Sequence, residues 1–269
     1  MWHKKMSFEA VSDEVLGTFV PIVVYWLYSG MYVVLDLLVG DKYRLHSKKD
    51  EDEKNVVPKK VVIKGVLMQQ FLQAMVAITC YMVIGNDGEN VVADEKSSSL
   101  IILIRQFFIA MVVLDTVQYF MHRFMHQNKF MYKHIHSQHH RLVVTYAYGA
   151  LYNHPLEGLF VDTFSGAMAF LVSGMSPRAS IFFYTFATIK AVDDHCGICL
   201  PWNIFHVIFK NNTAYHDIHH QFYGNKYNFS QPFFVMWDKL LGTYMPYSVE
   251  KRVNGRLEAR PDRNYKCIK

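Results

Sequence analysis

Residues 17–40 form a continuous apolar stretch that constrains the fold of this chain more than any other segment. The stretch reads GTFVPIVVYWLYSGMYVVLDLLVG, and Asp36 is its single charged residue. A helix needs about 20 such residues to span a bilayer. The segment also lacks the basic start, short apolar run and small-residue cleavage site of a secretory signal. It therefore predicts a retained membrane anchor rather than a buried helix of a soluble domain.

Further apolar segments extend this prediction to several membrane passages. Residues 65–85 predict a second span, and residues 99–120 predict a third. Residues 158–173 and 178–192 are shorter apolar runs that predict a helical hairpin, which either crosses the membrane twice or dips in from one side. Charged residues make up 19% of the chain, below the roughly 25% of soluble domains. We therefore expect an all-α multi-pass membrane protein with about four transmembrane helices and a cytosolic helical cap.

The basic residues predict how the chain is oriented. Loop 42–64 carries eight Lys and Arg residues, whereas loop 86–98 carries only Lys96 among several acids. Short loops rich in Lys and Arg stay in the cytosol. Loop 42–64 is therefore expected in the cytosol and loop 86–98 in the lumen, so the third span returns the chain to the cytosolic side. The net charge of +5 is modest and comes with no nucleic-acid-binding motif.

Nine histidines are the candidate functional residues of the cytosolic part. They are His122, His126, His136, His139, His140, His195, His216, His219 and His220. Within clusters the spacings are three and four, which places the imidazoles on one face of a helix. Imidazole is a ligand of zinc, copper, iron and nickel. Nine imidazoles are too many for one ion, because zinc takes four ligands. The pattern therefore predicts a di-metal site, with the metal left open between hydrolytic zinc and oxygen-activating iron.

Other side chains are candidates to support these ligands. A metal-bound histidine usually donates its second ring N–H to a carboxylate or a carbonyl. Asp115, Tyr119, Asp194 and Asp217 are the candidates for such contacts, although Asp115 is equally well explained as a polar residue satisfied inside the helical bundle. His154 and His206 are additional candidate ligands, and His3 and His46 are expected to face solvent. Cys196 and Cys199 are expected to pack as small apolar side chains.

At these histidines the chain resembles the fatty acid hydroxylase superfamily of membrane-bound non-haem di-iron enzymes. The family pattern HxxxH, HxxHH, a further His and HxxHH is matched by HRFMH at 122–126, HSQHH at 136–140, His195 and HDIHH at 216–220. The stretch YHDIHHQFYGNKYNFSQPFFVMWDKLLGTYMPY, with LYNHPLEG upstream, is most similar to the plant-type sphinganine C4-hydroxylases. Cys199 stands where some relatives have a further histidine, which leaves water, His154 or His206 to complete that iron's ligands.

The resemblance implies a di-iron monooxygenase of the endoplasmic reticulum membrane, with its active site facing the cytosol, that hydroxylates C4 of a sphingoid base or ceramide in sphingolipid biosynthesis. It implies two iron ions, dioxygen, and electrons from cytochrome b5 and an NADH-dependent reductase, with ceramide synthase as a further candidate partner. The implied regions are membrane anchor helices and loops at 1–98, the hydroxylase domain at 99–246, and a polar tail at 247–269 that is surface-bound or frayed. The same histidine pattern serves sterol C4-methyl oxidases and lipid desaturases, and a histidine-rich metal transporter is the non-enzymatic alternative.

Overall fold

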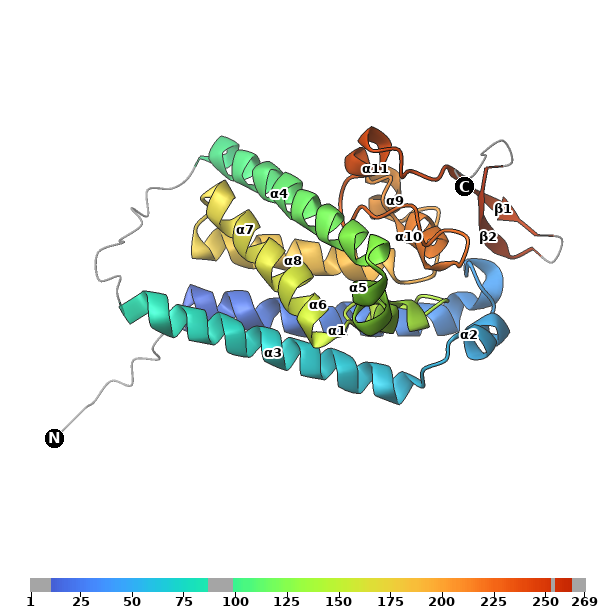
Figure 1. The fold of residues 1–269 in the computed structure, drawn as a ribbon, viewed down its shortest axis with the longest axis horizontal. Coiled ribbons are helices and arrows are strands. Elements are labelled where there is room, and N and C mark those ends of the chain that lie inside the picture. The colour runs from blue at the N-terminus through green and yellow to red at the C-terminus, as the bar shows by residue number, and fades with distance from the viewer. Residues whose placement is uncertain (1–10, 87–98, 253–254, 263–269) are drawn as a thin grey trace.

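The long helices of the protein lie side by side and form a bundle, as the ribbon shows (Figure 1). The structure is a computed structural model that describes residues 11–86, 99–252 and 255–262. The loop predicted to be lumenal therefore lies almost entirely outside the described residues. The bundle consists of α1 (Asp13–Val39), α3 (Lys59–Asn86), α4 (Leu100–Gln127), α7 (Phe164–Ser173) and α8 (Pro177–Asp194).

Four helical segments are long and apolar enough to cross a membrane. They are Asp13–Lys42, Lys59–Val83, Leu100–Gln127 and Pro155–Ser173. Many of their large apolar side chains are exposed, including Leu37, Phe71 and Ile101. An apolar surface of this kind is stable in lipid and not in water. The chain is therefore a mostly helical multi-pass membrane protein, as the apolar segments predicted.

The predicted helical hairpin is present as α7 and α8. Gly174 ends α7 with a φ of +64°, a left-handed conformation that glycine adopts without strain. Ser176 then caps α8 by accepting a hydrogen bond from the backbone N–H of Ala179, and Pro177 occupies the first turn. The two helices of the hairpin pack against different partners: α7 contacts α4, and α8 contacts α1.

The basic loop after α1 is folded rather than open. It contains helix α2 (Lys48–Lys54), which begins with a reciprocal capping box between Ser47 and Asp50. Arg44 donates hydrogen bonds to Asp36 of α1 and to Glu51 of α2, each with an N–O distance of 2.5 Å. These ion pairs hold α2 against the end of α1, beside the part of the molecule that contains the histidines.

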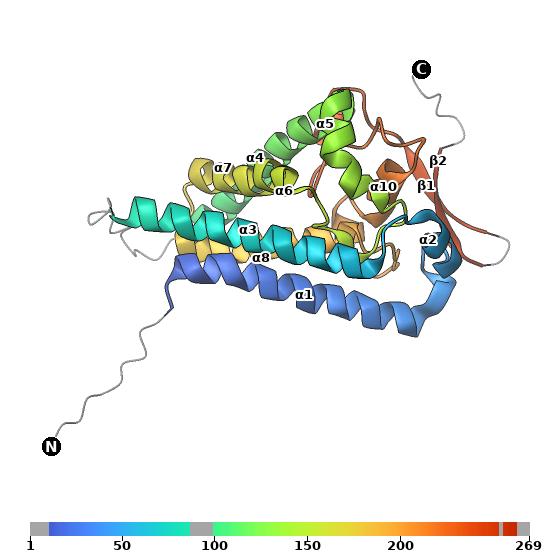
Figure 2. The ribbon, with the colours of Figure 1, turned by 60° about the horizontal axis from the view of Figure 1, so that its bottom comes forward.

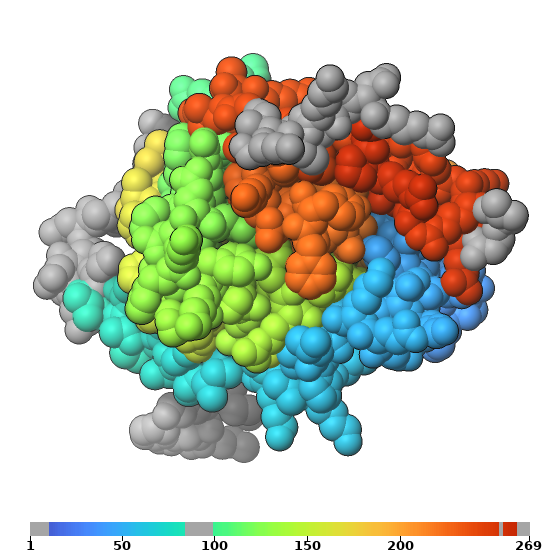
Figure 3. Space-filling view, turned by 45° about the vertical axis from the view of Figure 1, so that its right-hand side comes forward, coloured from blue at the N-terminus to red at the C-terminus, as the bar shows by residue number. Residues whose placement is uncertain are grey.

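Most of the smaller elements gather at this same end of the bundle, where Figure 2 shows α10 and the two strands beside α2. The smaller elements are α5 (Lys129–His134), α6 (Pro155–Glu157), α9 (Ile204–Ile208), α10 (Thr213–His220) and α11 (Met236–Leu240), with two strands, β1 (Tyr247–Lys251) and β2 (Leu257–Pro261). A space-filling view of this end shows segments from the whole chain meeting there, with α2, the 130–150 region, α10 and the strands next to one another (Figure 3). The predicted cap is therefore built from segments that are distant in sequence.

Two local features are more specific than the sequence predicted. The segment His136–Arg141 is a helix of the tighter 3₁₀ type. In the C-terminal region, β1 and β2 pair in an antiparallel hairpin. Ala259 of β2 is buried with Ile218 of α10 and Met245, so burial of apolar area holds the hairpin on the cap.

Candidate metal centre

The structure brings all nine histidines together in two adjacent groups. Group A contains His122, His126, His136, His140 and His219, and group B contains His139, His195, His216 and His220. Within each group the candidate ligand nitrogens lie within 4.8 Å of one another. The rings of His140 and His220, one from each group, stack with centroids 4.7 Å apart. The groups therefore form one continuous imidazole cluster at the end of the bundle.

Each HxxHH motif divides its side chains between the two groups. In the 3₁₀ helix, His136 and His140 belong to group A and His139 belongs to group B. In α10 the arrangement is reversed, since His216 and His220 belong to group B and His219 to group A. In the α-helix α10, residues four apart lie nearly on one line, and the residue at position three projects to the side of that line. The 3₁₀ helix makes the same division with a different geometry, because side chains three apart eclipse there. In both motifs the predicted helix face of imidazoles lies at the boundary between the two groups.

The distances between ring nitrogens match the space around a bound cation. In group A the Nε2 atom of His136 lies 2.8 Å from that of His126 and 3.1 Å from those of His122 and His140. Metal–imidazole bonds of about 2.1 Å place ligand nitrogens at right angles about 3 Å apart. In group B the Nε2 atoms of His216 and His220 are 2.9 Å apart. Both groups therefore have the spacing of first-row transition-metal sites.

The hydrogen bonds of the rings also favour a bound cation. The Nδ1–H of His122 donates to the backbone carbonyl of Phe229 at 2.8 Å, and the Nδ1 of His136 lies 2.7 Å from Oε1 of Glu157. A carbonyl accepts hydrogen bonds and never donates, so the proton of His122 is on Nδ1 and its Nε2 carries a lone pair. The same holds for His136 when its Nδ1–H donates to Oε1 of Glu157. Two lone pairs 3.1 Å apart repel each other unless a positive charge lies between them.

Burial keeps the cap histidines in the neutral form that binds metal. Desolvation lowers the pKa of His219 to about 3, against a smaller opposing effect of its bond to the carbonyl of Tyr227. Desolvation likewise lowers the pKa of His195 to about 4, and the Nδ1–H of that ring donates to the carbonyl of Ala191 at 2.7 Å. Both imidazoles are therefore neutral near neutral pH, with the proton on Nδ1, and can offer Nε2 to a metal.

Asp115 and Tyr119 make contacts other than those expected. The carboxylate of Asp115 accepts hydrogen bonds from the backbone N–H groups of Phe233 at 3.1 Å and Phe234 at 2.5 Å. The hydroxyl of Tyr119 lies 2.8 Å from Oγ1 of Thr243. Neither contact involves a histidine of groups A or B. Asp115 therefore agrees with the second interpretation of the sequence, that of a polar residue hydrogen-bonded inside the helical bundle. Its two hydrogen bonds hold the 233–234 backbone against α4.

Asp194 and Asp217 also pair with residues outside the two groups. Asp194 forms an ion pair with Lys190. Asp217 lies 2.8 Å from Nε2 of His46, a histidine that was expected to face solvent but is largely covered. This contact joins the basic loop to α10, the helix that supplies three of the nine histidines. The two aspartates therefore connect helices of the cap, and the expectation for His46 is wrong.

Glu157 is the carboxylate that contacts a group A ring, and sequence reasoning missed it. It is buried in α6, two residues after Pro155. Backbone carbonyls accept hydrogen bonds from the rings of His122, His195 and His219. No sequence pattern distinguishes such carbonyls. The signal for Glu157 was available, since the motif NHPLEG contains one carboxylate and lies near the second histidine cluster.

The two additional candidate ligands, His154 and His206, lie outside both groups. His154 caps α6 through Nδ1, which accepts the backbone N–H of Leu156. His206 lies 3.2 Å from Asp193, in a cluster that also includes Cys196. Burial raises the pKa of the Cys196 thiol, and a protonated thiol is a poor metal ligand. Cys199 packs against the apolar cluster of α10 and β2, as predicted for a small apolar side chain.

Replacing Glu157 with Gln should weaken metal binding at group A. The substitution keeps the shape of the side chain but removes the charge that orients His136 and strengthens its basicity. We expect a loss of metal affinity of about 10- to 100-fold, the usual effect of removing such a partner. The measurement is the metal retained by purified protein during dialysis against graded chelator. Glu53→Gln on the surface of α2 is the matched control. Equal retention in E157Q and wild type would contradict the assignment.

Comparison with known proteins places these residues in a family. The fatty acid hydroxylase family model matches residues 107–243, which include all nine histidines. Sphinganine C4-monooxygenase 1 of Arabidopsis thaliana is 69% identical, over 96% of this chain and 97% of that protein. The Very-long-chain aldehyde decarbonylase GL1-9 of Oryza sativa subsp. indica is 57% identical, over 94% and 97% respectively. Sphingolipid C4-hydroxylase sur2 of Schizosaccharomyces pombe is 39% identical, over 89% and 91%. No solved structure matches the chain. The chain therefore belongs to the fatty acid hydroxylase family.

Proposed function

We propose that this protein is a sphinganine C4-monooxygenase, an oxidoreductase that inserts one oxygen atom at C4 of a sphingoid base. The observation that carries the proposal is the pair of buried imidazole groups, in a chain 69% identical to a protein named for this reaction. One atom of dioxygen enters the C4–H bond and the other leaves as water, which consumes two electrons and two protons. Cytochrome b5 and its NADH-dependent reductase are the proposed electron source.

The donor set favours two iron ions. Neutral imidazoles suit iron, and the two groups offer five and four of them at adjacent positions. Iron held there would supply the activation of dioxygen that attack on an unactivated methylene requires. The protein's part is to keep the rings neutral, to orient His136 through Glu157 and His122 through the carbonyl of Phe229, and to exclude water from the centre.

The proposed location is the membrane of the endoplasmic reticulum, with the active site facing the cytosol, and the arrangement of the cap supports this orientation. Helix α2 and the basic loop lie at the same end of the bundle as α10 (Figure 1). The contact between His46 and Asp217 joins these two segments directly. Since a short loop rich in Lys and Arg stays in the cytosol, the imidazole groups are proposed to face that compartment. The sphingoid tail would then lie among the bilayer helices, with its headgroup at the interface.

A second activity is favoured by one relative. The rice protein that is 57% identical is named a very-long-chain aldehyde decarbonylase. The same imidazole groups could serve such a substrate, because a histidine-bound metal centre sets the chemistry while the surrounding walls select the lipid. Sterol C4-methyl oxidase and lipid desaturase activities remain alternatives for the same reason. Substrate trials must therefore include these lipids beside the sphingoid base.

The experiment is expression in cells that lack C4-hydroxylation. Cells are supplied with dihydrosphingosine under ¹⁸O₂, and long-chain bases are measured by mass spectrometry in the free and ceramide pools. The expected product is a trihydroxy base carrying one ¹⁸O atom. A variant with His139→Ala serves as the inactive control. Conversion of a supplied very-long-chain aldehyde to alkane, without any trihydroxy base, would replace the proposal by the decarbonylase activity.

A further inference from the structure

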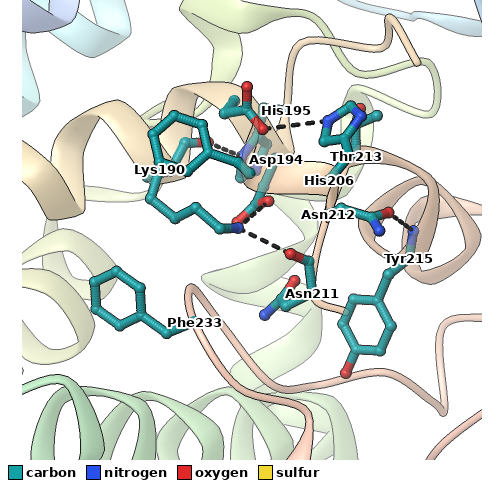
Figure 4. Close-up of polar contacts among 12 residues, drawn as sticks. Lys190, Asp194, His195, His206, Asn211, Asn212, Thr213, Tyr215 and Phe233 are labelled. Carbon is teal, nitrogen blue, oxygen red and sulfur yellow. Dashed lines mark hydrogen bonds and ion pairs between the residues drawn. The ribbon is translucent and has the colours of Figure 1, made fainter. Parts of the chain in front are cut away.

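Lys190 is a fully buried lysine next to the imidazole cluster, and the proposed reaction does not use it. Its side chain is 0% exposed on α8, and its ammonium pairs with the carboxylate of Asp194 (Figure 4). The ammonium also donates a hydrogen bond to the backbone carbonyl of Asn211 at 3.0 Å, and it lies 5.3 Å from the ring centre of Phe209. Lysine is almost never fully buried unless it is paired. The buried charge of Lys190 therefore depends on these partners.

The two partners of Lys190 belong to the ends of two helices. Asp194 is the last residue of α8, and His195 follows it directly as the C-cap. Asn211 immediately precedes Asn212, whose side chain caps α10 by accepting the backbone N–H groups of Ala214 and Tyr215. Lys190 therefore joins the end of α8 to the beginning of α10 through one buried cation.

Further bonds extend this connection. The side-chain amide of Asn211, itself fully buried, donates to the carbonyl of Ser230 at 2.9 Å. The backbone N–H of Gly197 donates to Oγ1 of Thr213 at 3.0 Å. The junction thus holds three backbone segments together in an environment that excludes water, where a charged hydrogen bond is strongest.

The junction lies next to group B rather than group A. Group B takes His195 from the end of α8 and His216 and His220 from α10, and the rings of His195 and His216 have centroids only 4.1 Å apart. Group A takes no residue from α8, and four of its five histidines come from α4 and the 3₁₀ helix. A change in the position of α8 against α10 must therefore disturb group B first.

We propose that Lys190 is a positioning residue that holds α8 and α10 together so that group B retains its metal ion. The inference rests on the proposed two-metal centre. The hydrogen bonds of the Lys190 ammonium go to Asp194 and to the carbonyl of Asn211, and neither partner is a histidine ring. Its loss should therefore remove metal from one group and leave the other loaded.

The test measures iron in full-length protein purified in detergent. Wild type is expected to hold two iron ions per chain, and Lys190→Met is expected to hold one. In the oxidised state, the remaining ion should give the electron paramagnetic resonance signal of an isolated ferric ion, which a coupled pair lacks. Arg178→Met is the matched control, because Arg178 is an exposed cation on the same helix, and it should keep two ions.

A double variant keeps the test decisive if K190M is not recovered in folded form. Removing one partner of a buried pair leaves an uncompensated charge, whereas removing both does not. Lys190→Met combined with Asp194→Asn should therefore fold and still hold one ion, because the bond to Asn211 is lost. Two ions in the folded variant, or none, would overturn the inference. Fewer than two ions in wild type would instead contradict the proposed function.

Discussion

His219→Ala is expected to reduce formation of the trihydroxy base to background while the protein still inserts into membranes. His219 lies on α10 but belongs to group A, where its ring centroid is 4.6 Å from that of His122. Its Nδ1–H also bonds the carbonyl of Tyr227 at 2.7 Å. The substitution therefore removes a ligand that α10 alone can supply, and it also breaks the contact between α10 and the 227–234 segment. The helices of the bundle keep their apolar contacts, so insertion is unaffected.

The assay combines product analysis with membrane fractionation. His134→Ala is the matched control, because His134 is an exposed histidine outside both groups, and it should retain wild-type turnover. His139→Ala makes the same test for group B, since His139 is the corresponding residue of the other motif. Wild-type turnover in H219A or H139A would refute the assignment of that position as a ligand.

Purified wild-type protein is expected to contain two iron ions per chain, and their removal should abolish turnover. Each imidazole group can hold one ion, because group A offers five ligand nitrogens and group B offers four. A single four-coordinate zinc ion would use fewer than half of these nine nitrogens. Chelation under reducing conditions should give inactive protein that regains activity with ferrous iron and not with zinc. Metal content is measured by mass spectrometry of the purified chain, in parallel with turnover.

Two other outcomes have clear meanings. One zinc ion per chain would contradict the oxygenase proposal, because zinc has no redox chemistry. Rapid exchange of bound metal with added isotope, together with metal uptake into vesicles, would support the transporter alternative. Slow exchange is expected because seven of the nine histidines are buried.

The local features of the fold and site could be predicted from sequence, and the long-range ones could not. Membrane helices and histidine spacings are local patterns, so residues 17–40 and the motifs at 136–140 and 216–220 were recognisable directly. The contact between His122 and the carbonyl of Phe229 joins positions 107 residues apart. Such contacts depend on how helices pack, and a backbone carbonyl leaves no mark in the sequence. The β1–β2 hairpin was missed for the same reason, since burial against α10 stabilises it.

The division of each HxxHH motif between the two groups has a consequence for biogenesis. Group A needs His219 and group B needs His216 and His220, so both depend on α10, which emerges late in synthesis. A ribosome-bound chain that ends before Thr213 contains six of the nine histidines but completes neither group. The bundle helices are synthesised before that point. We therefore expect metal to enter the two groups after the helices have entered the bilayer.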